Sequence, residues 1–214
     1  MSGATRNLAW MTRGYEFFLA QLKLNDDARL DGPSRLPGWT GRHLLSHVGH
    51  NALALGRLTH WARTGEPTPM YPGPDARAQE IDAGAAWPVR RLREFVEEEQ
   101  ERLSTAVDGF TEAMWNAEVV TAQGRTVPAS TIPWLRAREV WIHACDLPYA
   151  ADFAQLPADF LDALIADAVT CRSAQGVDAA DLDVTGEAAD VARWLTGRGT
   201  SSADAPRPAL PPWL

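Results

Sequence analysis

The sequence contains few cysteines and no long apolar run, and each absence narrows what the protein can be. Cys145 and Cys171 are the only two cysteines, too few for a disulfide framework and wrongly spaced for a cysteine zinc site. We therefore expect a reduced compartment. No run of about 18 consecutive apolar residues occurs, and the N-terminus lacks the apolar core of a secretory signal. The sequence predicts a cytoplasmic protein with no membrane partner.

Positive charge is scarce relative to negative charge. The chain of 214 residues carries 20 lysines and arginines against 28 aspartates and glutamates, for a formal net charge of −8. Proteins that bind nucleic acids neutralise phosphates with an excess of basic groups, so we expect no nucleic-acid partner. With 45% hydrophobic and 22% charged residues, the composition is that of a globular protein. We expect a monomer or a small homo-oligomer.

Apolar residues recur every three or four positions in four segments of the first 150 residues, the pattern of amphipathic helices. Thr40 and Thr131 are the expected N-caps of the second and fourth helices. A segment rich in proline and glycine, 65–75, is of the kind that lines a site, and 116–130 fits either an extended pair or a loop. The predicted helices span residues 4–24, 41–64, 88–110 and 132–150.

Four helices without a strand-rich core predict a mainly α fold in which the first part of the chain is a helical bundle. Beyond residue 157, the pattern predicts helices over 158–173 and 187–195, a strand over 182–185, and a proline-rich tail. The expected domains are therefore a four-helix bundle over residues 1–152 and a small α/β domain over residues 153–214.

The fourth predicted helix places a carboxylate and a histidine on its buried face. Glu139 and His143 are four residues apart, so their side chains lie one turn apart on the same side. The second helix carries His43, His47 and His50 at spacings of four and three, with His47 the most inward. Two histidines and one carboxylate on facing helices suit a zinc ion whose fourth position stays open for a ligand.

Two interpretations of this cluster are open. In one, the three residues bind zinc, and Asn51 and Asp146 orient the imidazoles as hydrogen-bond partners. In the other, Glu139 forms a metal-free pair within the bundle, with a histidine or with Arg138. Both interpretations provide a group that neutralises the buried carboxylate of Glu139, because burial of an unpaired carboxylate is costly.

Several arginines lie near these segments and provide sites for an acidic small molecule. Arg125 lies in the segment 121–130, Arg136 lies in the fourth helix, and Arg198 follows Gly197. Because a planar guanidinium matches a carboxylate with two hydrogen bonds, they are candidates for substrate or thiol binding. Taken singly, each is more simply explained as a surface residue or a member of an ion pair.

Four segments, in order along the chain, resemble the mycothiol-dependent maleylpyruvate isomerases. They are PGWTGRHLLSHVGHNA at 37–52, HWARTGEPTPMY at 60–71, TAQGRTVPAS at 121–130 and REVWIHA at 138–144. The likeness covers roughly residues 5–150 and returns at TGRG over 196–199 and at the terminal PPWL. It implies a DinB-like four-helix bundle followed by a small α/β domain. That domain is expected to be shortened, because residues 176–182 lack strands that relatives carry.

The resemblance also implies a reaction. One zinc ion per chain would be held by His47, Glu139 and His143 and would lower the pKa of a small thiol, with mycothiol the expected one. The thiolate would add to the cis double bond of maleylpyruvate, a compound of gentisate degradation, and would leave after rotation to give fumarylpyruvate. Arg198 is implied as an essential arginine, and Arg125 is expected to help it hold the carboxylates of the substrate.

Other functions stay open at this point. A transferase that conjugates the thiol to an electrophile would use the same cluster, as would a zinc-dependent hydrolase. A metal-free binding module would need Glu139 and His143 only as a buried pair. The sequence does not identify the thiol either, since glutathione, bacillithiol and ergothioneine would present the same sulfur to the metal.

Overall fold

The computed structural model of the chain describes residues 3–178, 182, 184–199 and 210. The chain divides into two compact units, Met1–Ala150 and Ala151–Leu214. The domain boundary after residue 152, which the sequence predicts, stays a proposal about how the chain is organised.

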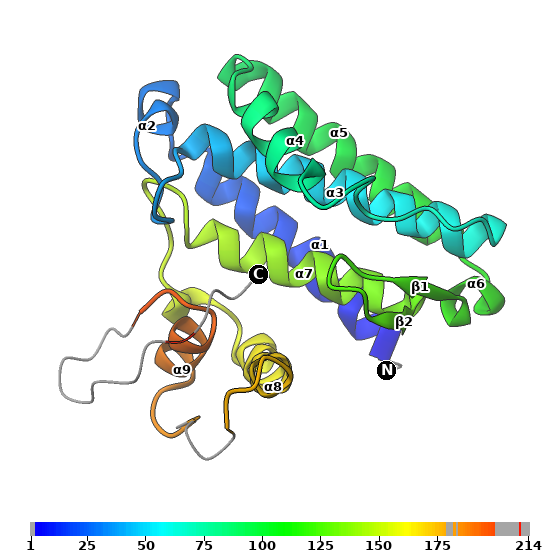
Figure 1. Cartoon of the computed structure of the whole chain (residues 1–214). Helices are drawn as coiled ribbons and strands as arrows, with labels where there is room; N and C mark the ends of the chain where they lie inside the picture. The colour runs from blue at the N-terminus through cyan, green and yellow to red at the C-terminus, as the bar shows by residue number, and fades with distance from the viewer. Residues whose placement is uncertain (1–2, 179–181, 183, 200–209, 211–214) are drawn as a thin grey trace. The chain divides into compact units, whose positions relative to one another are not determined.

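Four long helices build the first unit, as the periodicity predicts. α1 packs along α7, α3 packs along α5, and α3 also contacts α7, so the four helices form a bundle (Figure 1). The predicted mainly α fold class is confirmed. Side chains from all four helices fill the interior, among them Phe18, Leu45, Val96 and Val140. The bounds of the helices are Gly3–Leu22 for α1, Gly41–Thr64 for α3, Val89–Asp108 for α5 and Ile132–Ala144 for α7.

Shorter elements connect these helices, and most of them have no clear signal in the sequence. A hairpin forms where an extended pair was one of two expectations: β1 (Glu118–Val120) and β2 (Thr126–Pro128) are antiparallel, with Gly124 at φ 76° in the turn. The remaining elements are too short or too weakly amphipathic to show a helical period. They are α2 (Asp27–Asp31), α4 (Ala76–Ala85), α6 (Glu112–Asn116) and the 3-10 turn η1 (Ala129–Thr131).

The ends of α3 and α7 show where boundary predictions succeed and fail. Thr40 caps α3 as expected, since its Oγ1 accepts from the N–H of His43 at 3.4 Å and His43 Nδ1 accepts from the N–H of Thr40 at 3.3 Å. Thr131 makes no side-chain cap, because the turn η1 precedes α7. α7 ends at Ala144 rather than near residue 150, and Pro148 disfavours a continued helix.

Helices are the regular elements of the second unit in the part of the chain that the structure describes. Its elements are η2 (Phe153–Gln155), α8 (Ala158–Ala174) and α9 (Ala188–Leu195). α8 packs against α9, and Trp194 and Leu195 belong to the apolar cluster of this unit. The two helices predicted from the sequence are therefore both present. The terminal PPWL and most of the proline-rich tail lie outside the described residues.

The strand predicted over residues 182–185 is not formed at the described positions Leu182, Val184 and Thr185, and Asp183 lies outside the described residues. Leu182 instead joins the apolar cluster between α8 and α9. A strand needs a neighbour to pair its N–H and C=O groups, and no partner strand occurs among the described residues of this unit. Of the apolar residues in this segment, Leu182 is buried and Val184 is exposed, so the pattern that suggested a strand marks one buried side chain.

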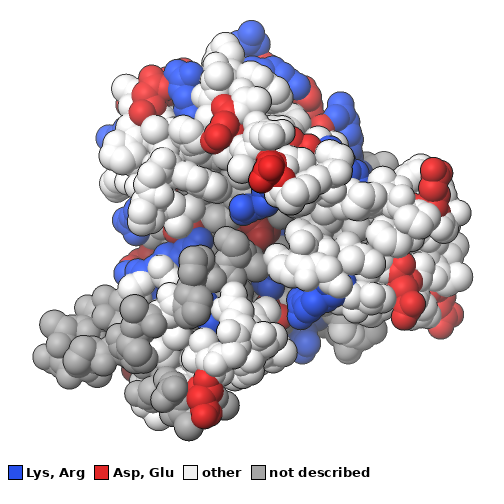
Figure 2. Space-filling view, in the orientation of Figure 1, with Lys and Arg blue, Asp and Glu red and all other residues white. Residues whose placement is uncertain are grey.

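Charge on the surface is mixed in sign. Acidic and basic side chains are interspersed over the described part of the face in Figure 2. Along α5, Arg90 pairs with Glu94 at 2.6 Å and Arg91 with Glu98 at 3.1 Å, so these half-buried glutamates of the helix have basic partners. Within the part of the chain that the structure describes, no helix is long and apolar enough to cross a bilayer.

Gly14 of α1 tests how closely α1 and α7 approach, and Gly56 of α3 provides the control. A Cβ on Gly14 would lie 2.6 Å from the ring of Trp141, and that ring is held by its hydrogen bond to the carbonyl of Trp10 at 3.0 Å. We expect Gly14→Ala to lower the free energy of unfolding by about 1–3 kcal/mol through overpacking. Gly56→Ala in α3 meets no atom within 4 Å and is expected to raise it by about 0.5–1 kcal/mol. Urea unfolding measures both, and equal effects would contradict the close approach.

Candidate metal centre

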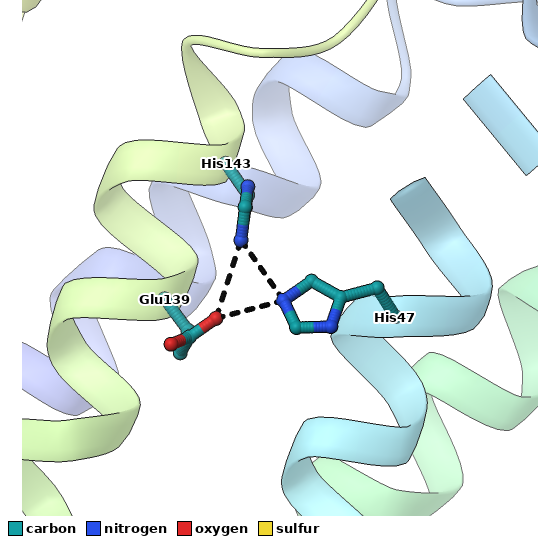
Figure 3. A group of neighbouring side chains, drawn as sticks. All are labelled: His47, Glu139 and His143. Carbon is teal, nitrogen blue, oxygen red and sulfur yellow. Dashed lines mark hydrogen bonds and ion pairs between the residues drawn. The ribbon is translucent and has the colours of Figure 1, made fainter. Parts of the chain in front are cut away.

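Three polar side chains converge between α3 and α7 (Figure 3). His47 Nε2 lies 2.9 Å from Glu139 Oε2 and 3.0 Å from His143 Nε2, and the third side of the triangle, from His143 Nε2 to Glu139 Oε2, is 3.2 Å. All three residues are buried. The convergence that the helical spacing predicts is therefore found, and Glu139 Oε2 lies within hydrogen-bond distance of both histidines.

The electrostatics of the cluster follow from burial and mutual contact. Burial lowers the pKa of His47 to about 4, which leaves its imidazole neutral at physiological pH. Burial disfavours the carboxylate of Glu139, but hydrogen bonds from His143 and His47 outweigh it and hold the pKa of Glu139 well below its usual value. Burial likewise opposes protonation of His143, yet its contacts with Asp146 and Glu139 raise its pKa.

The geometry places three electron-pair donors at one point. Because the Nδ1–H of His143 faces Asp146, a neutral His143 presents a lone pair at Nε2, as Glu139 does at Oε2. A proton or a cation between these atoms removes the repulsion. Nitrogen and oxygen ligands of a tetrahedral zinc ion, each about 2.0–2.1 Å from the metal, lie about 3.3 Å apart. The observed sides of 2.9 to 3.2 Å are close to that value, so the donor set fits a small divalent cation.

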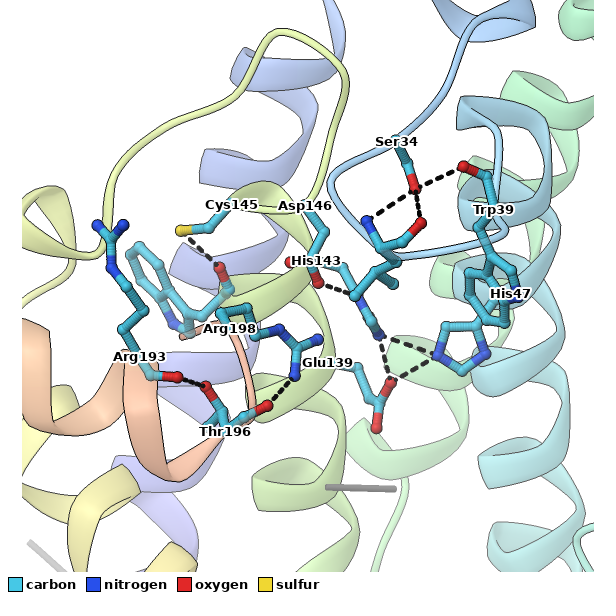
Figure 4. Close-up of polar contacts among 12 residues, drawn as sticks. Ser34, Trp39, His47, Glu139, His143, Cys145, Asp146, Arg193, Thr196 and Arg198 are labelled. Atoms are coloured by element: carbon cyan, nitrogen blue, oxygen red, sulfur yellow. Dashed lines mark hydrogen bonds and ion pairs between the residues drawn. The ribbon is translucent and has the colours of Figure 1, made fainter. Parts of the chain in front are cut away.

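Of the two residues predicted to orient the imidazoles, one contacts a histidine and the other does not. Asp146 Oδ2 lies 2.8 Å from His143 Nδ1 and is fully buried (Figure 4). This contact selects the tautomer whose Nε2 lone pair faces the cluster. Asn51 Oδ1 accepts instead from Arg136 at 2.9 Å, and no hydrogen bond joins Asn51 to His47 or His143 in the described part of the chain. The placement predicted for Asn51 is wrong.

Arg136 does not lie where a substrate or thiol could reach it. Its side chain is fully buried, with Nε donating to Gln100 Oε1 at 2.8 Å and Nη1 donating to the carbonyl of Val48 at 2.8 Å and to Asn51. Burial lowers the pKa of Arg136 to about 10, against the opposing effect of the charge on Glu139. Arg136 therefore joins α7 to α3 and α5 inside the bundle, and the role predicted for it is wrong.

The other two predicted arginines lie in turns. Arg125 is exposed in the β1–β2 hairpin, where its N–H donates to Thr121 Oγ1 at 3.3 Å. Its guanidinium has no hydrogen bond or ion pair with any described residue. Arg198, in the second unit, follows α9, and its Nη1 donates to the carbonyl of Thr196 at 2.5 Å (Figure 4). Substrate contacts for Arg125 and Arg198 stay predictions.

The other two histidines of the spacing motif, His43 and His50, have structural roles. His43 completes the N-terminal cap, and His50 Nδ1 lies 2.8 Å from the carbonyl of Ser46. His50 also packs against the rings of Phe95 and Trp87, with ring centroids 4.7 and 6.0 Å away. Neither histidine joins the cluster, which leaves His47 as the ligand candidate from this helix.

Three residues near the cluster escape the sequence analysis. Trp39 packs against His47, with ring centroids 5.4 Å apart. Burial raises the pKa of Tyr71 to about 12, and the charges of Arg77 and Glu139 also act on it. The charge of Arg77 acts on His47 too. Two signals could have pointed to Tyr71: the proline- and glycine-rich segment that precedes α4, and the segment HWARTGEPTPMY at 60–71, which Tyr71 ends.

The bundle and its buried cluster together define a class of protein, the helical bundles whose facing helices direct histidine and carboxylate side chains inward. The sequence model of one family, described as the mycothiol maleylpyruvate isomerase N-terminal domain, matches residues 12–148. The chain therefore belongs to the mycothiol-dependent maleylpyruvate isomerase family. This confirms the resemblance of the four sequence segments.

Two solved structures are similar over nearly the whole chain. A crystal structure of the mycothiol-dependent maleylpyruvate isomerase is 37% identical, with a TM-score of 0.88, and the match covers 97% of this chain and 96% of that chain. A crystal structure of a histidine-to-alanine mutant of a mycothiol-dependent maleylpyruvate isomerase is 36% identical, with the same TM-score and coverage. The comparison with curated proteins finds no match.

The coverage corrects one expectation. Because 96% of the solved enzyme is matched, the C-terminal region of this chain is not shortened relative to that enzyme. The expectation came from the missing strand pattern over residues 176–182, and the absence of a pattern does not require the absence of residues.

Substitution of Arg136 tests its role inside the bundle. We expect Arg136→Met to lower the free energy of unfolding by about 3 kcal/mol, because it leaves the buried acceptors of Gln100, Val48 and Asn51 unpaired. Arg90→Met removes an exposed pair and should cost less than about 0.5 kcal/mol. Urea unfolding with a chelator present measures both without a contribution from metal. Similar small losses for the two variants would contradict the role.

Proposed function

We propose that the protein is a zinc-dependent maleylpyruvate isomerase that uses mycothiol as its thiol cofactor. One observation carries the proposal: His47 Nε2, Glu139 Oε2 and His143 Nε2 meet within 3.2 Å of one another, in a chain of the mycothiol-dependent maleylpyruvate isomerase family. The partners we propose are therefore a small thiol and a dicarboxylate. The other thiols and the transferase reaction are outcomes of the tests below.

The residues of the cluster would hold one zinc ion per chain with a position left for an exogenous ligand. Glu139 contributes the negative charge, and the neutral imidazole of His47 contributes a lone pair. Asp146 holds the proton of His143 on Nδ1, so that Nε2 is available to the metal. Two neutral ligands and one anion leave a bound dication with a net positive charge, which favours an anionic fourth ligand.

When bound, zinc and the thiol would supply a nucleophilic sulfur at neutral pH that adds reversibly to the double bond of the substrate, which makes rotation about that bond possible. The chain itself would have to bind two carboxylates and to favour the negative charge that develops on the keto oxygen during addition. Guanidinium groups suit both tasks. Arg198 and Arg125 are the candidates, while Arg136 is excluded by its burial.

Metal analysis of two histidine variants from one helix tests the metal site. We expect about one zinc ion per chain in the wild type after extensive dialysis, and a loss of more than 90% in His47→Ala, because two ligands do not hold zinc tightly. His60→Ala is the matched control, since His60 is exposed on the same helix and should keep the full metal content. Zinc retained in His47→Ala, or absent from the wild type, would contradict the site.

The isomerase reaction can be separated from its rivals by its balance of thiol. We expect the zinc-loaded protein to convert maleylpyruvate into the trans product, seen by absorbance, while mycothiol added in catalytic amount is fully recovered. Parallel reactions with glutathione and with bacillithiol identify the thiol. Consumption of one thiol per turnover would indicate a transferase, and conversion to a hydrolysed product without thiol would indicate a hydrolase. Either result overturns the proposed reaction.

A further inference from the structure

We propose that Arg172 is a positioning residue that holds Arg198 in place at the end of α9. The proposal rests on the proposed function in one respect, the essential role of Arg198. Arg172 belongs to α8, is fully buried, and appears in none of the sequence motifs. The hydrogen bonds described below join it to Leu195, Gln175 and Val177 of the second unit.

The backbone of Arg198 is fixed by the way α9 ends. Gly197 adopts the left-handed conformation, with φ at 80°, and its N–H donates to the carbonyl of Trp194 at 2.9 Å. The N–H of Arg198 donates to the carbonyl of Arg193 at 3.0 Å. This pair of hydrogen bonds is the Schellman motif, in which glycine follows the last helical residues and the next residue closes the turn. Arg198 is therefore the residue whose N–H closes the motif.

Two arginines satisfy the carbonyl groups that the motif leaves unpaired. The Nε and Nη2 of Arg172 both donate to the carbonyl of Leu195, at 2.9 and 2.7 Å. The carbonyl of Thr196 accepts from Nη1 of Arg198 at 2.5 Å. The four carbonyls of residues 193–196 therefore all have donors, and the guanidinium of Arg172 supplies two of the hydrogen bonds.

The rest of Arg172 anchors this contact to α8. Its Nη1 donates to Gln175 Oε1 at 2.9 Å, and its carbonyl accepts from the N–H of Val177 at 3.1 Å. The guanidinium is thus held on both sides, between the end of α8 and the end of α9. A shift of Arg172 would move the carbonyl of Leu195 and, with it, the turn that carries Arg198.

A helix does not need a buried arginine in order to end. Gly197 already supplies the conformation that ends α9, and burial of a guanidinium is costly. Burial lowers the pKa of Arg172, and the nearby positive charge of Arg198 also lowers it. The chain keeps two cations close together at this turn although they repel. That cost has a reason if the two parallel N–H groups of Arg172 are needed to fix the turn and, with it, the direction of the Arg198 side chain.

Kinetics of four variants of the full chain test the proposal. We expect Arg172→Gln to lower kcat/KM for isomerisation at least tenfold with zinc content unchanged, and to change kcat and KM in the same proportion as Arg198→Ala does. The double variant should be within about twofold of Arg198→Ala alone, because a residue that acts only through Arg198 has no effect once Arg198 is gone. Thr170→Ala, which removes only an exposed hydrogen bond within α8 to the carbonyl of Ala166, is the matched control and should lose less than threefold.

The positioning role would be overturned if the losses of the two single variants multiplied in the double variant, or if Arg172→Gln stayed active while Arg198→Ala was inactive. Either result would leave the proposed function standing.

A second measurement needs no substrate. In Arg172→Lys, which keeps the charge but not the fork, the amides of Gly197 and Arg198 should exchange hydrogen at least tenfold faster, while amides of α3 do not change. Unchanged exchange at Gly197 and Arg198 would overturn the proposal even if the protein had no isomerase activity.

Discussion

The rest of the structure depends on one arrangement, the three acceptor atoms of His47, Glu139 and His143 that face one point between α3 and α7. Lone pairs placed this close repel one another unless a proton or a cation lies between them. Without metal, the contacts of His143 with Asp146 and Glu139 raise its pKa, which favours a proton on this histidine. A dication at the same point would turn the repulsion into attraction, so metal binding and the stability of the bundle are coupled. The fold must hold the three donor atoms together both with and without a cation.

The bundle meets this demand by fixing α7 on opposite faces. On one face, Arg136 donates to the backbone of Val48, the neighbour of His47, from one turn before Glu139 on α7. On the other face, Trp141 is held by the carbonyl of Trp10 against a glycine that leaves room for its ring. Neither contact touches the three donor atoms. Each restricts how α7 can turn or slide, and the distance across the cluster depends on that restriction.

Sequence reasoning succeeds where a residue's role follows from its spacing. Glu139 and His143 are one turn apart on a buried face, and an acid there needs a partner, so His47 on the facing helix could be found. It fails where a role depends on which polar groups meet in the core. Arg136 and Arg125 look alike in the sequence, and only the bundle shows that one is enclosed by Gln100 and Asn51. The short helices α2, α4 and α6 fail for another reason, since a few residues carry too little period.

The environments of the arginines also decide how each can serve catalysis. Arg136 is buried, and most of its N–H groups donate to other groups of the protein. It can therefore affect the chemistry only through its positive charge, which favours the ionised form of Glu139. Arg125 and Arg198 lie in turns, one in a hairpin and one after a helix. A guanidinium in a turn can exchange water for a substrate carboxylate at little cost, provided that the turn itself is rigid. In the proposed function, recognition of the substrate would therefore depend on how firmly those turns are held, which for Arg198 would mean the hydrogen bonds from the buried guanidinium of Arg172.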